Sequence, residues 1–333
     1  MGTYALSDTG ARRALWNGVL ILGLALVLAI ALATQLGAAR VSLAALIARD
    51  PIAETIFLTI RLPRVLLAAL VGAILAVTGL TFQTLLRNPL ADPFILGVSG
   101  GAACGAAVAT ALGLARYPGV IPVVAFGGAC VAMVAVLMLA RRELTLDPSR
   151  LLLAGLVLNA FFSALILLAL SLTGGSDLSA ALRWMMGTFF SASWSDVAML
   201  SAVLAFSLVA LVALSGELRL MAFGEDDARS RGVNTTPVIL MVFLVSSLAT
   251  GAAVSVSGII GFVGLLVPHA IRMIWKHDYR VLLPLAALGG GTLLVLADAL
   301  SRSIMAPGEL PIGALTALLG VPFFFVLLRR LAR

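Results

Sequence analysis

The chain has 333 residues, of which 62% are hydrophobic and 11% are charged, and its formal net charge is +7. A soluble domain is roughly half apolar and about a quarter charged, so this composition excludes a soluble globular protein and indicates a polytopic membrane protein. Nucleic-acid binding is disfavoured because no basic stripe lies on a soluble surface. No G-x-x-x-x-G-K-[ST] motif occurs, so the chain cannot itself form a Walker A phosphate-binding loop.

Apolar segments follow one another along nearly the whole sequence. A helical span needs about 20 apolar residues, and the chain accommodates about ten such spans. We therefore expect an all-α polytopic membrane protein with a single transmembrane domain over residues 1–333. In chain order the expected spans lie near residues 15–36, 56–86, 94–114, 120–140, 151–172, 197–214, 238–256, 258–275, 281–300 and 312–331.

Two segments need a separate interpretation. The first span has Arg12 and Arg13 before it, like a signal peptide, but it is longer than the about 7–15 apolar residues typical of one, so we expect a retained helix. Residues 182–190 are apolar and aromatic but too short to span a membrane, which predicts an interfacial or re-entrant helix. Trp184 and Trp194 suit a membrane interface.

The orientation follows from the distribution of Lys and Arg among the loops. With ten spans and both termini in the cytoplasm, the inner loops carry roughly twice as many Lys and Arg as the outer loops, as the positive-inside rule requires. Residues 89–102 weakly resemble residues 309–322, and this topology puts the two loops on opposite sides of the membrane. That arrangement predicts an inverted repeat.

A rigid chain reversal separates the second and third expected spans. The sequence RNPLADP begins at Arg87, and its two prolines fix φ and lack N–H donors on either side of Asp92. The flanking helices are rich in Gly, Ala, Ser and Thr, which favour close helix–helix contact in lipid. Gln83 lies in an otherwise apolar helix, so it needs a polar partner or a water-filled cavity.

This stretch carries a resemblance to a known family. RLPR from Arg61, RNPLADP, and the LGVS and GA runs after it resemble the FecCD-like permeases of type II ATP-binding-cassette importers, which take up iron-siderophores, haem and vitamin B12. GFVGLLVPH, HDYR and ELPIG in the second half resemble the same family, in the same order. The motifs run from Arg61 to Pro322, which is nearly the whole chain.

The longest polar interruption covers residues 216–236. Within it three acids, two arginines and a closing glycine predict a short helix, because acids suit the N-terminal end of the helix dipole and arginines the C-terminal end. One interpretation is a solvated loop. The other is a coupling helix for an ATPase partner, and the family resemblance favours it. The residues concerned are Glu225, Asp226, Asp227, Ala228, Arg229, Ser230, Arg231 and Gly232.

Three arginines are expected at the outer ends of two spans. Arg61 and Arg64 are three residues apart on one helix and share a face, and Arg302 ends the ninth span on the same side. Isolated arginines here would direct their charge to lipid headgroups. The resemblance implies instead that all three bind carboxylates of a substrate-binding protein, for which charge-assisted Arg–carboxylate pairs are well suited.

The resemblance also implies a cytoplasmic gate, formed by Asn88 and Leu90 in the reversal loop and by Pro148 and Ser149 before the fifth span.

Among intramembrane polar residues, Asp298 and Arg302 are spaced to form an i,i+4 pair, and we favour a structural pair over a proton relay. His269 follows Pro268, and its simplest role is a hydrogen-bonded imidazole at a helix kink.

Together these features predict the membrane subunit of an ATP-driven importer in a bacterial or archaeal cytoplasmic membrane, not an enzyme. The resemblance implies a homodimer, two separate ATPase subunits that use ATP and Mg, and a periplasmic or lipid-anchored binding protein. We expect no cofactor or metal on this chain, since no His, Cys or carboxylate cluster has metal-ligand spacing. The alternatives are a secondary transporter, which needs intramembrane acids for ion binding, and an intramembrane enzyme. The cargo is left open between siderophore, haem and cobalamin.

Overall fold

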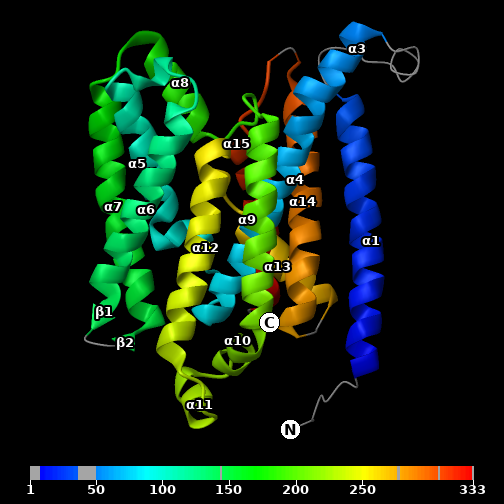
Figure 1. Ribbon diagram of the computed structural model, residues 1–333, viewed down its shortest axis with the longest axis vertical. Coiled ribbons are helices and arrows are strands. Elements are labelled where there is room, and N and C mark those ends of the chain that lie inside the picture. Colours follow the sequence, from blue (N-terminus) through cyan, green and yellow to red (C-terminus); the bar gives the residue numbers. More distant parts are fainter. Residues whose placement is uncertain (1–7, 37–49, 143–144, 276–277, 307, 332–333) are drawn as a thin grey trace.

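The computed structural model describes residues 8–36, 50–142, 145–275, 278–306 and 308–331 (Figure 1). In this part of the chain, 7 helices or continuous helical runs are long and apolar enough to cross a membrane. They are α1 (Asp8–Gln35), the run of α3 (Pro51–Thr55), η1 (Ile56–Arg61) and α4 (Leu62–Leu85), then α6 (Val120–Ala140), α7 (Pro148–Ser171), α9 (Trp194–Ala213), α12 (Thr235–Ser257) and α14 (Tyr279–Ile304).

Two shorter apolar helices, α5 (Val98–Ala111) and α13 (Val263–Ile274), and α15 (Ile312–Leu331), whose apolar part is residues 312–323, complete the bundle. Within the described residues the long and short helices together confirm the expected number of about ten. Short elements that do not span are α8 (Gly175–Met185), α10 (Ser215–Met221), α11 (Glu225–Ser230), the 3-10 turns η2 (Pro93–Leu96) and η3 (Leu114–Arg116), and an antiparallel pair of β1 (Arg141–Arg142) and β2 (Thr145–Leu146).

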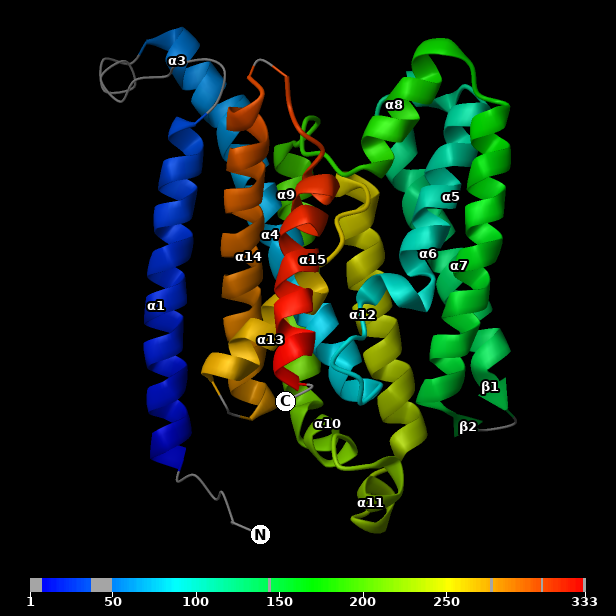
Figure 2. The same cartoon turned by 180° about the vertical axis from the view of Figure 1, so that it is seen from behind.

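Helix α4 is the centre of the bundle. In the most apolar stretch of the α3–α4 run 89% of the residues are buried inside the protein, against 11% for α1, which stands at the edge (Figures 1 and 2). Helix α4 packs against α9, α12, α13 and α14. Helices α5, α6 and α7 pack on one another on the other side of α12 (Figures 1 and 2). Nearly every face of α4 is therefore a protein contact.

Glycines allow this central packing. A Cβ atom added at Gly72 would lie 2.2 Å from the carbonyl oxygen of Gly290 on α14, and one at Gly79 would lie 2.0 Å from that of Gly264 on α13. Backbone therefore meets backbone at both crossings. This is the close approach of small residues by which helices associate in lipid, where no hydrophobic driving force acts between them.

We expect Gly79→Ala to lower the free energy of unfolding by about 1–3 kcal/mol, because the added methyl group must push α13 away from α4. Gly127→Ala on α6 is the matched control, since nothing lies within 4 Å of a Cβ there. The thermal midpoint of each purified variant in the same detergent measures the effect. Equal midpoints for the two variants would contradict the close α4–α13 contact.

Several helix boundaries depart from the expected ones; the eighth span, for example, starts five residues late, because α13 begins at Val263 after Phe262 at φ 69°. The third span starts four residues late, because residues 93–96 form the 3-10 turn η2 and Gly97 at φ 86° separates it from α5. The predicted short helix at residues 182–190 is wrong in its position: α8 covers Gly175–Met185, and Gly187 at φ 81° follows its end. The backbone beyond α8 pairs instead with a distant segment, since Thr188 N–H donates to the Ser257 carbonyl at 2.8 Å.

The two ends of the bundle differ. We call the end that carries α3 and α8 the α3 end, and the opposite end, with α10 and α11, the α11 end (Figure 1). Helix α1 begins, and α15 ends, toward the α11 end (Figures 1 and 2). The RNPLADP loop lies toward the α11 end, and α15 begins toward the α3 end, as the predicted inverted repeat requires (Figure 2). The cytoplasmic location of the α11 end stays a prediction.

Candidate functional site

The three predicted docking arginines lie together at the α3 end and are buried. Arg61, Arg64 and Arg302 are 5%, 7% and 6% exposed. The Nε and Nη2 groups of Arg64 donate to one carboxylate oxygen of Asp298 at 3.0 and 2.9 Å. The Nε group of Arg302 donates to the other at 3.0 Å, so the expected i,i+4 pair is present.

A second carboxylate and the end of α1 complete this cluster. Arg64 also holds both oxygens of Glu309, at 2.8 and 2.9 Å, and Glu309 lies in the loop before α15. Arg302 donates to the carbonyls of Leu36 at 2.8 Å and Ala33 at 3.1 Å, and Arg61 donates to that of Thr34 at 2.7 Å. The cluster thus joins α1, α4, α14 and the loop before α15.

The burial of these arginines differs from the expected display of their charge to a partner. Sequence spacing places Arg61, Arg64 and Arg302 at one end, but Asp298, Glu309 and the carbonyls of α1 turn their guanidinium groups inward. Glu309 is the accessible member, since its side chain is 35% exposed. The docking role of the three arginines stays a prediction.

At the α11 end, the structure contains the predicted short helix. Helix α11 begins at Glu225 after Gly224, which has φ 142°, and Gly232 at φ 86° follows its end. Arg229 donates to Glu225 at 2.6 Å and to the Thr235 hydroxyl at 3.0 Å, and that hydroxyl donates to Glu225 at 2.9 Å. These bonds fasten α11 to the first turn of α12.

One face of α11 is internal and the other is free. Ala228 is fully buried, and its carbonyl accepts from Val233 N–H at 3.0 Å. Asp226, Asp227, Ser230 and Arg231 are exposed. A small rigid helix with exposed charges of both signs at the end of a membrane bundle is suited to contact a second protein. Its coupling role stays a prediction.

The RNPLADP loop forms a compact turn. The Asn88 side chain accepts from Leu90 N–H at 2.9 Å, and the Asn88 carbonyl accepts from Ala91 N–H at 3.0 Å. Leu90 is 44% exposed. At the start of α7, the Asp147 carboxylate accepts from Ser149 N–H at 2.8 Å, with Pro148 at the first helical position. No hydrogen bond among the described residues joins Asn88 or Leu90 to Pro148 or Ser149.

Asp92 connects this loop to α13. Its carboxylate accepts from Phe94 N–H at 2.9 Å and from the backbone N–H of Phe262, the residue before α13. Burial raises the pKa of Asp92 to about 6, and the two N–H donors only partly offset that effect. The sequence predicts the turn but not this link, because Phe262 is far away in the chain.

The raised pKa of Asp92 predicts that the stability of the folded protein depends on pH. An exposed aspartate has a pKa of about 3.9, so between about pH 4 and pH 6 the folded state holds a proton that the unfolded state has lost. The stabilisation is complete below the unfolded pKa and is lost as the pH rises through about 6. We expect Asp92→Asn to gain less in thermal midpoint than wild type on going from about pH 7 to about pH 5. Asp177→Asn, at an exposed position on α8, is the control, and equal gains in all three proteins would contradict the assignment.

Gln83 finds the polar partner that its position requires. Its amide donates to the Gly264 carbonyl at 3.1 Å and accepts from Arg272 on α13 at 2.9 Å. Arg272 also reaches the Leu80 carbonyl and the Thr84 hydroxyl, each at 3.3 Å. The need for a partner follows from the sequence, whereas the identity of Arg272 does not.

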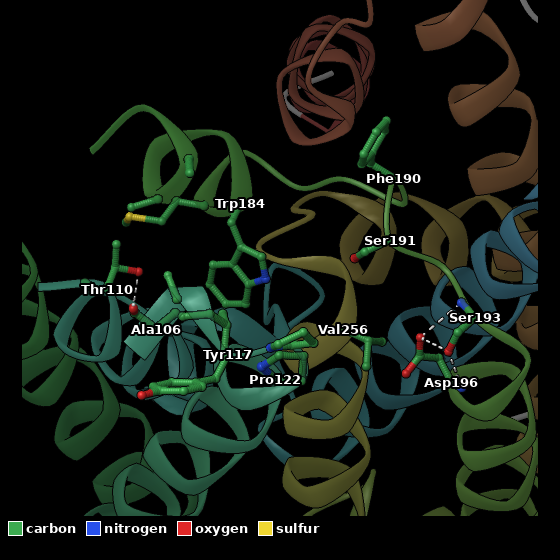
Figure 3. A pocket seen from close by; sticks show the side chains of 18 of the residues that line it. Ala106, Thr110, Tyr117, Pro122, Trp184, Phe190, Ser191, Ser193, Asp196 and Val256 are labelled. Atoms are coloured by element: carbon green, nitrogen blue, oxygen red, sulfur yellow. Dashed lines mark hydrogen bonds between the residues drawn. The ribbon is translucent and has the colours of Figure 1, made fainter. Parts of the chain in front are cut away.

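Of the cavities at the described residues, two that open between the helices are wide enough to matter for transport. The larger has a volume of about 840 Å³, lies at the α3 end, and is walled by α5, α6, α8, α9 and α12. Figure 3 shows Trp184 and Tyr117 at one side and Ser193 and Asp196 at the other. The second, of about 720 Å³, lies beside the RNPLADP loop and includes Leu90, Asp92 and Asn159. Met185 lines both cavities, so the end of α8 separates them.

An all-α bundle of apolar spans, with cavities between the helices and a charged helix at one end, is the architecture of a polytopic membrane protein and suits a transport subunit. The chain belongs to the FecCD transport family, which it matches over residues 21–330. The predicted family and fold class are thereby confirmed.

The relatives agree with this assignment. The ABC transporter permease protein YvrB of Bacillus subtilis is 45% identical over 286 residues, covering 84% of this chain and 80% of YvrB. The cobalamin import permease BtuC of Halobacterium salinarum is 42% identical, covering 83% of this chain and 74% of BtuC. The hemin transport permease HmuU of Yersinia pestis is 41% identical and covers 83% of each chain.

A solved structure agrees as well. An inward-facing metal-chelate type ABC transporter matches with a TM-score of 0.84 and 32% identity, covering 94% of this chain and 98% of the other. The chain is accordingly a permease of an ABC importer and a multi-pass protein of a bacterial or archaeal cytoplasmic membrane.

Proposed function

We propose that two copies of this chain form the membrane pathway of an importer for an iron chelate (a ferric siderophore or haem) or for cobalamin. The names of the relatives, which include hemin and cobalamin permeases and a metal-chelate type transporter, support this cargo class. Two separate ATPase subunits hydrolyse ATP with Mg, and a periplasmic or lipid-anchored binding protein delivers the cargo. This chain contributes no cofactor and no hydrolytic step.

Helix α11 is the proposed contact through which the ATPase subunits act on the permease. Residues 225–232 dock into a groove of the ATPase subunit, and closure of the two ATPases on ATP displaces α11. The observation that supports this is the combination of a fixed inner face, through Ala228 and Thr235, with free charges at Asp226, Asp227 and Arg231. A helix held in this way moves as one body with the start of α12.

The proposed gate lies near the same end of the bundle. Asn88 and Leu90 in the RNPLADP loop, and Pro148 and Ser149 at the start of α7, narrow the pathway toward the cytoplasm. Leu90 supports this because it is 44% exposed and lines the 720 Å³ cavity. The second copy of the chain supplies the facing wall.

Docking of the binding protein is assigned to the α3 end. Arg61, Arg64 and Arg302 are the proposed sites, and an incoming carboxylate has to replace Glu309 on Arg64, because both carboxylate oxygens of Glu309 are already bound there.

The same cluster of arginines and carboxylates disfavours a secondary transporter. Asp298, the acid that such a mechanism would use, is fully buried between two arginines.

The test is ATPase activity in liposomes. The chain is co-purified with candidate ATPase subunits and mixed with binding proteins loaded with ferric siderophore, haem or cobalamin. Stimulation by one loaded protein, and not by its empty form, identifies the cargo and supports the importer assignment. Failure of the chain to associate with any ATPase subunit would overturn the proposal.

A further inference from the structure

Helix α13 lies between the proposed coupling segment and the proposed gate, and it is fastened at both ends. At its start, Asp92 accepts from the Phe262 N–H, and Pro93 packs on Gly264, where an added Cβ would lie 2.7 Å from the proline ring. The gate loop is thus attached to the first turn of α13.

The start and the end of α13 are hydrogen-bonded to the last two turns of α4. Arg272 donates to the Gln83 side chain at 2.9 Å and to the Leu80 carbonyl and Thr84 hydroxyl at 3.3 Å, while Gln83 donates back to the Gly264 carbonyl at 3.1 Å. Gln83 is 2% exposed, so little water competes for these bonds. Helix α4 ends at Leu85, and the gate loop follows directly.

The start of α14 leads from α13 to the coupling segment. Helix α14 packs against α13, and at its start Asp278 pairs with Arg219 on α10 at 3.1 Å while Arg280 donates to the Ser215 hydroxyl at 2.8 Å. Helix α10 packs against α11. A shorter route also exists, because the Arg87 guanidinium lies 3.6 Å from where a Cβ would stand on Gly224. That contact involves an exposed arginine, and the Arg219–Asp278 pair is exposed as well, whereas the contacts between α13 and α4 are internal.

We propose that Arg272 is a positioning residue that makes α13 and the end of α4 move as one body, so that displacement of α10 and α11 reaches the gate loop through α13. This inference rests on the proposed function. Without Arg272, the ATPases still displace α11, but α13 and α4 no longer move together. ATP hydrolysis then continues while cargo transport fails. Loss of folding alone would lower ATPase activity and transport together.

The experiment compares Arg272→Gln, Arg272→Lys and Gln83→Leu in proteoliposomes with the ATPase subunits. Radiolabelled cobalamin, haem and ferric siderophore are offered in parallel with their binding proteins. Cargo transported per ATP hydrolysed is measured beside the thermal midpoint. Met273→Ala, at an exposed position next to Arg272, is the matched control.

We expect cargo per ATP to fall at least tenfold in Arg272→Gln and Gln83→Leu, with ATPase activity within about twofold of wild type. Arg272→Lys should retain part of the wild-type cargo transported per ATP. Its ammonium group can donate to Gln83, but it lacks the planar guanidinium group that contacts several acceptors at once. An unchanged ratio, or a proportional loss of uptake and ATPase activity in all three variants, would overturn the role of Arg272. Absence of ATP-dependent uptake in wild type would instead overturn the proposed function.

Discussion

Asp298→Ala is expected to lower the free energy of unfolding by about 3–5 kcal/mol, the typical cost of removing one partner of a buried ion pair. Asp298 is fully buried and binds Arg64 at 2.9 Å and Arg302 at 3.0 Å. Without it, two arginines that are under 10% exposed lose their shared carboxylate. The measurement is the thermal midpoint of the purified permease in detergent, with denaturant titration for the free energy.

Glu309→Gln is the matched control for this prediction. Glu309 binds the same Arg64, but its side chain is 35% exposed, so water replaces part of the lost interaction. We expect a cost of about 1 kcal/mol or less, as for a surface pair. Equal effects of Asp298→Ala and Glu309→Gln would show that the buried position of Asp298 does not matter, and would contradict the arrangement of the cluster.

The second large effect is expected at α11. The double variant Arg229→Glu/Arg231→Glu reverses two positive charges, one on the six-residue helix α11 and one at the residue that follows it. Like-charge juxtaposition at an interface costs several kcal/mol, and each 1.4 kcal/mol is about tenfold in affinity. We therefore expect at least a tenfold loss of ATPase-subunit binding and of stimulated ATP hydrolysis.

Two controls separate docking from folding. Arg229 binds Glu225 and Thr235 inside the protein, so Arg231→Glu alone changes an exposed charge without breaking those bonds. Arg183→Glu makes the same reversal at an exposed position of α8, near the other end. Binding measured by co-purification should fall for Arg231→Glu and persist for Arg183→Glu. Equal losses in both would argue against α11 as the docking element.

The sequence predicted the helices well because long apolar runs have few alternatives in a membrane. Its errors lie where backbone conformation depends on distant partners. Gly97 and Gly187 adopt positive φ, and the segment after α8 pairs with Ser257, so neither boundary could be placed from local composition. The inward pairing of Arg64 is of the same kind, since Asp298 is 234 residues away in the chain.

Polar residues in apolar helices were a reliable signal of a site without identifying its members. Gln83 indicated that a partner had to exist, and Arg272 provides it from a position 189 residues further on. Asp92 was visible only as a turn residue, although it also connects the loop to α13. The two cavities could not be predicted, because Ala, Gly, Leu and Met are equally suited to packing and to lining a space.

On the proposed function, ATP and no ion gradient drives transport through this permease. The most direct measurement is uptake of radiolabelled cobalamin, haem and ferric siderophore into proteoliposomes that hold the permease and its ATPase subunits, with ionophores present to collapse every gradient. We predict accumulation of one of the three cargoes that requires Mg-ATP and its loaded binding protein. Uptake that needs an ion gradient and ignores ATP would contradict the account.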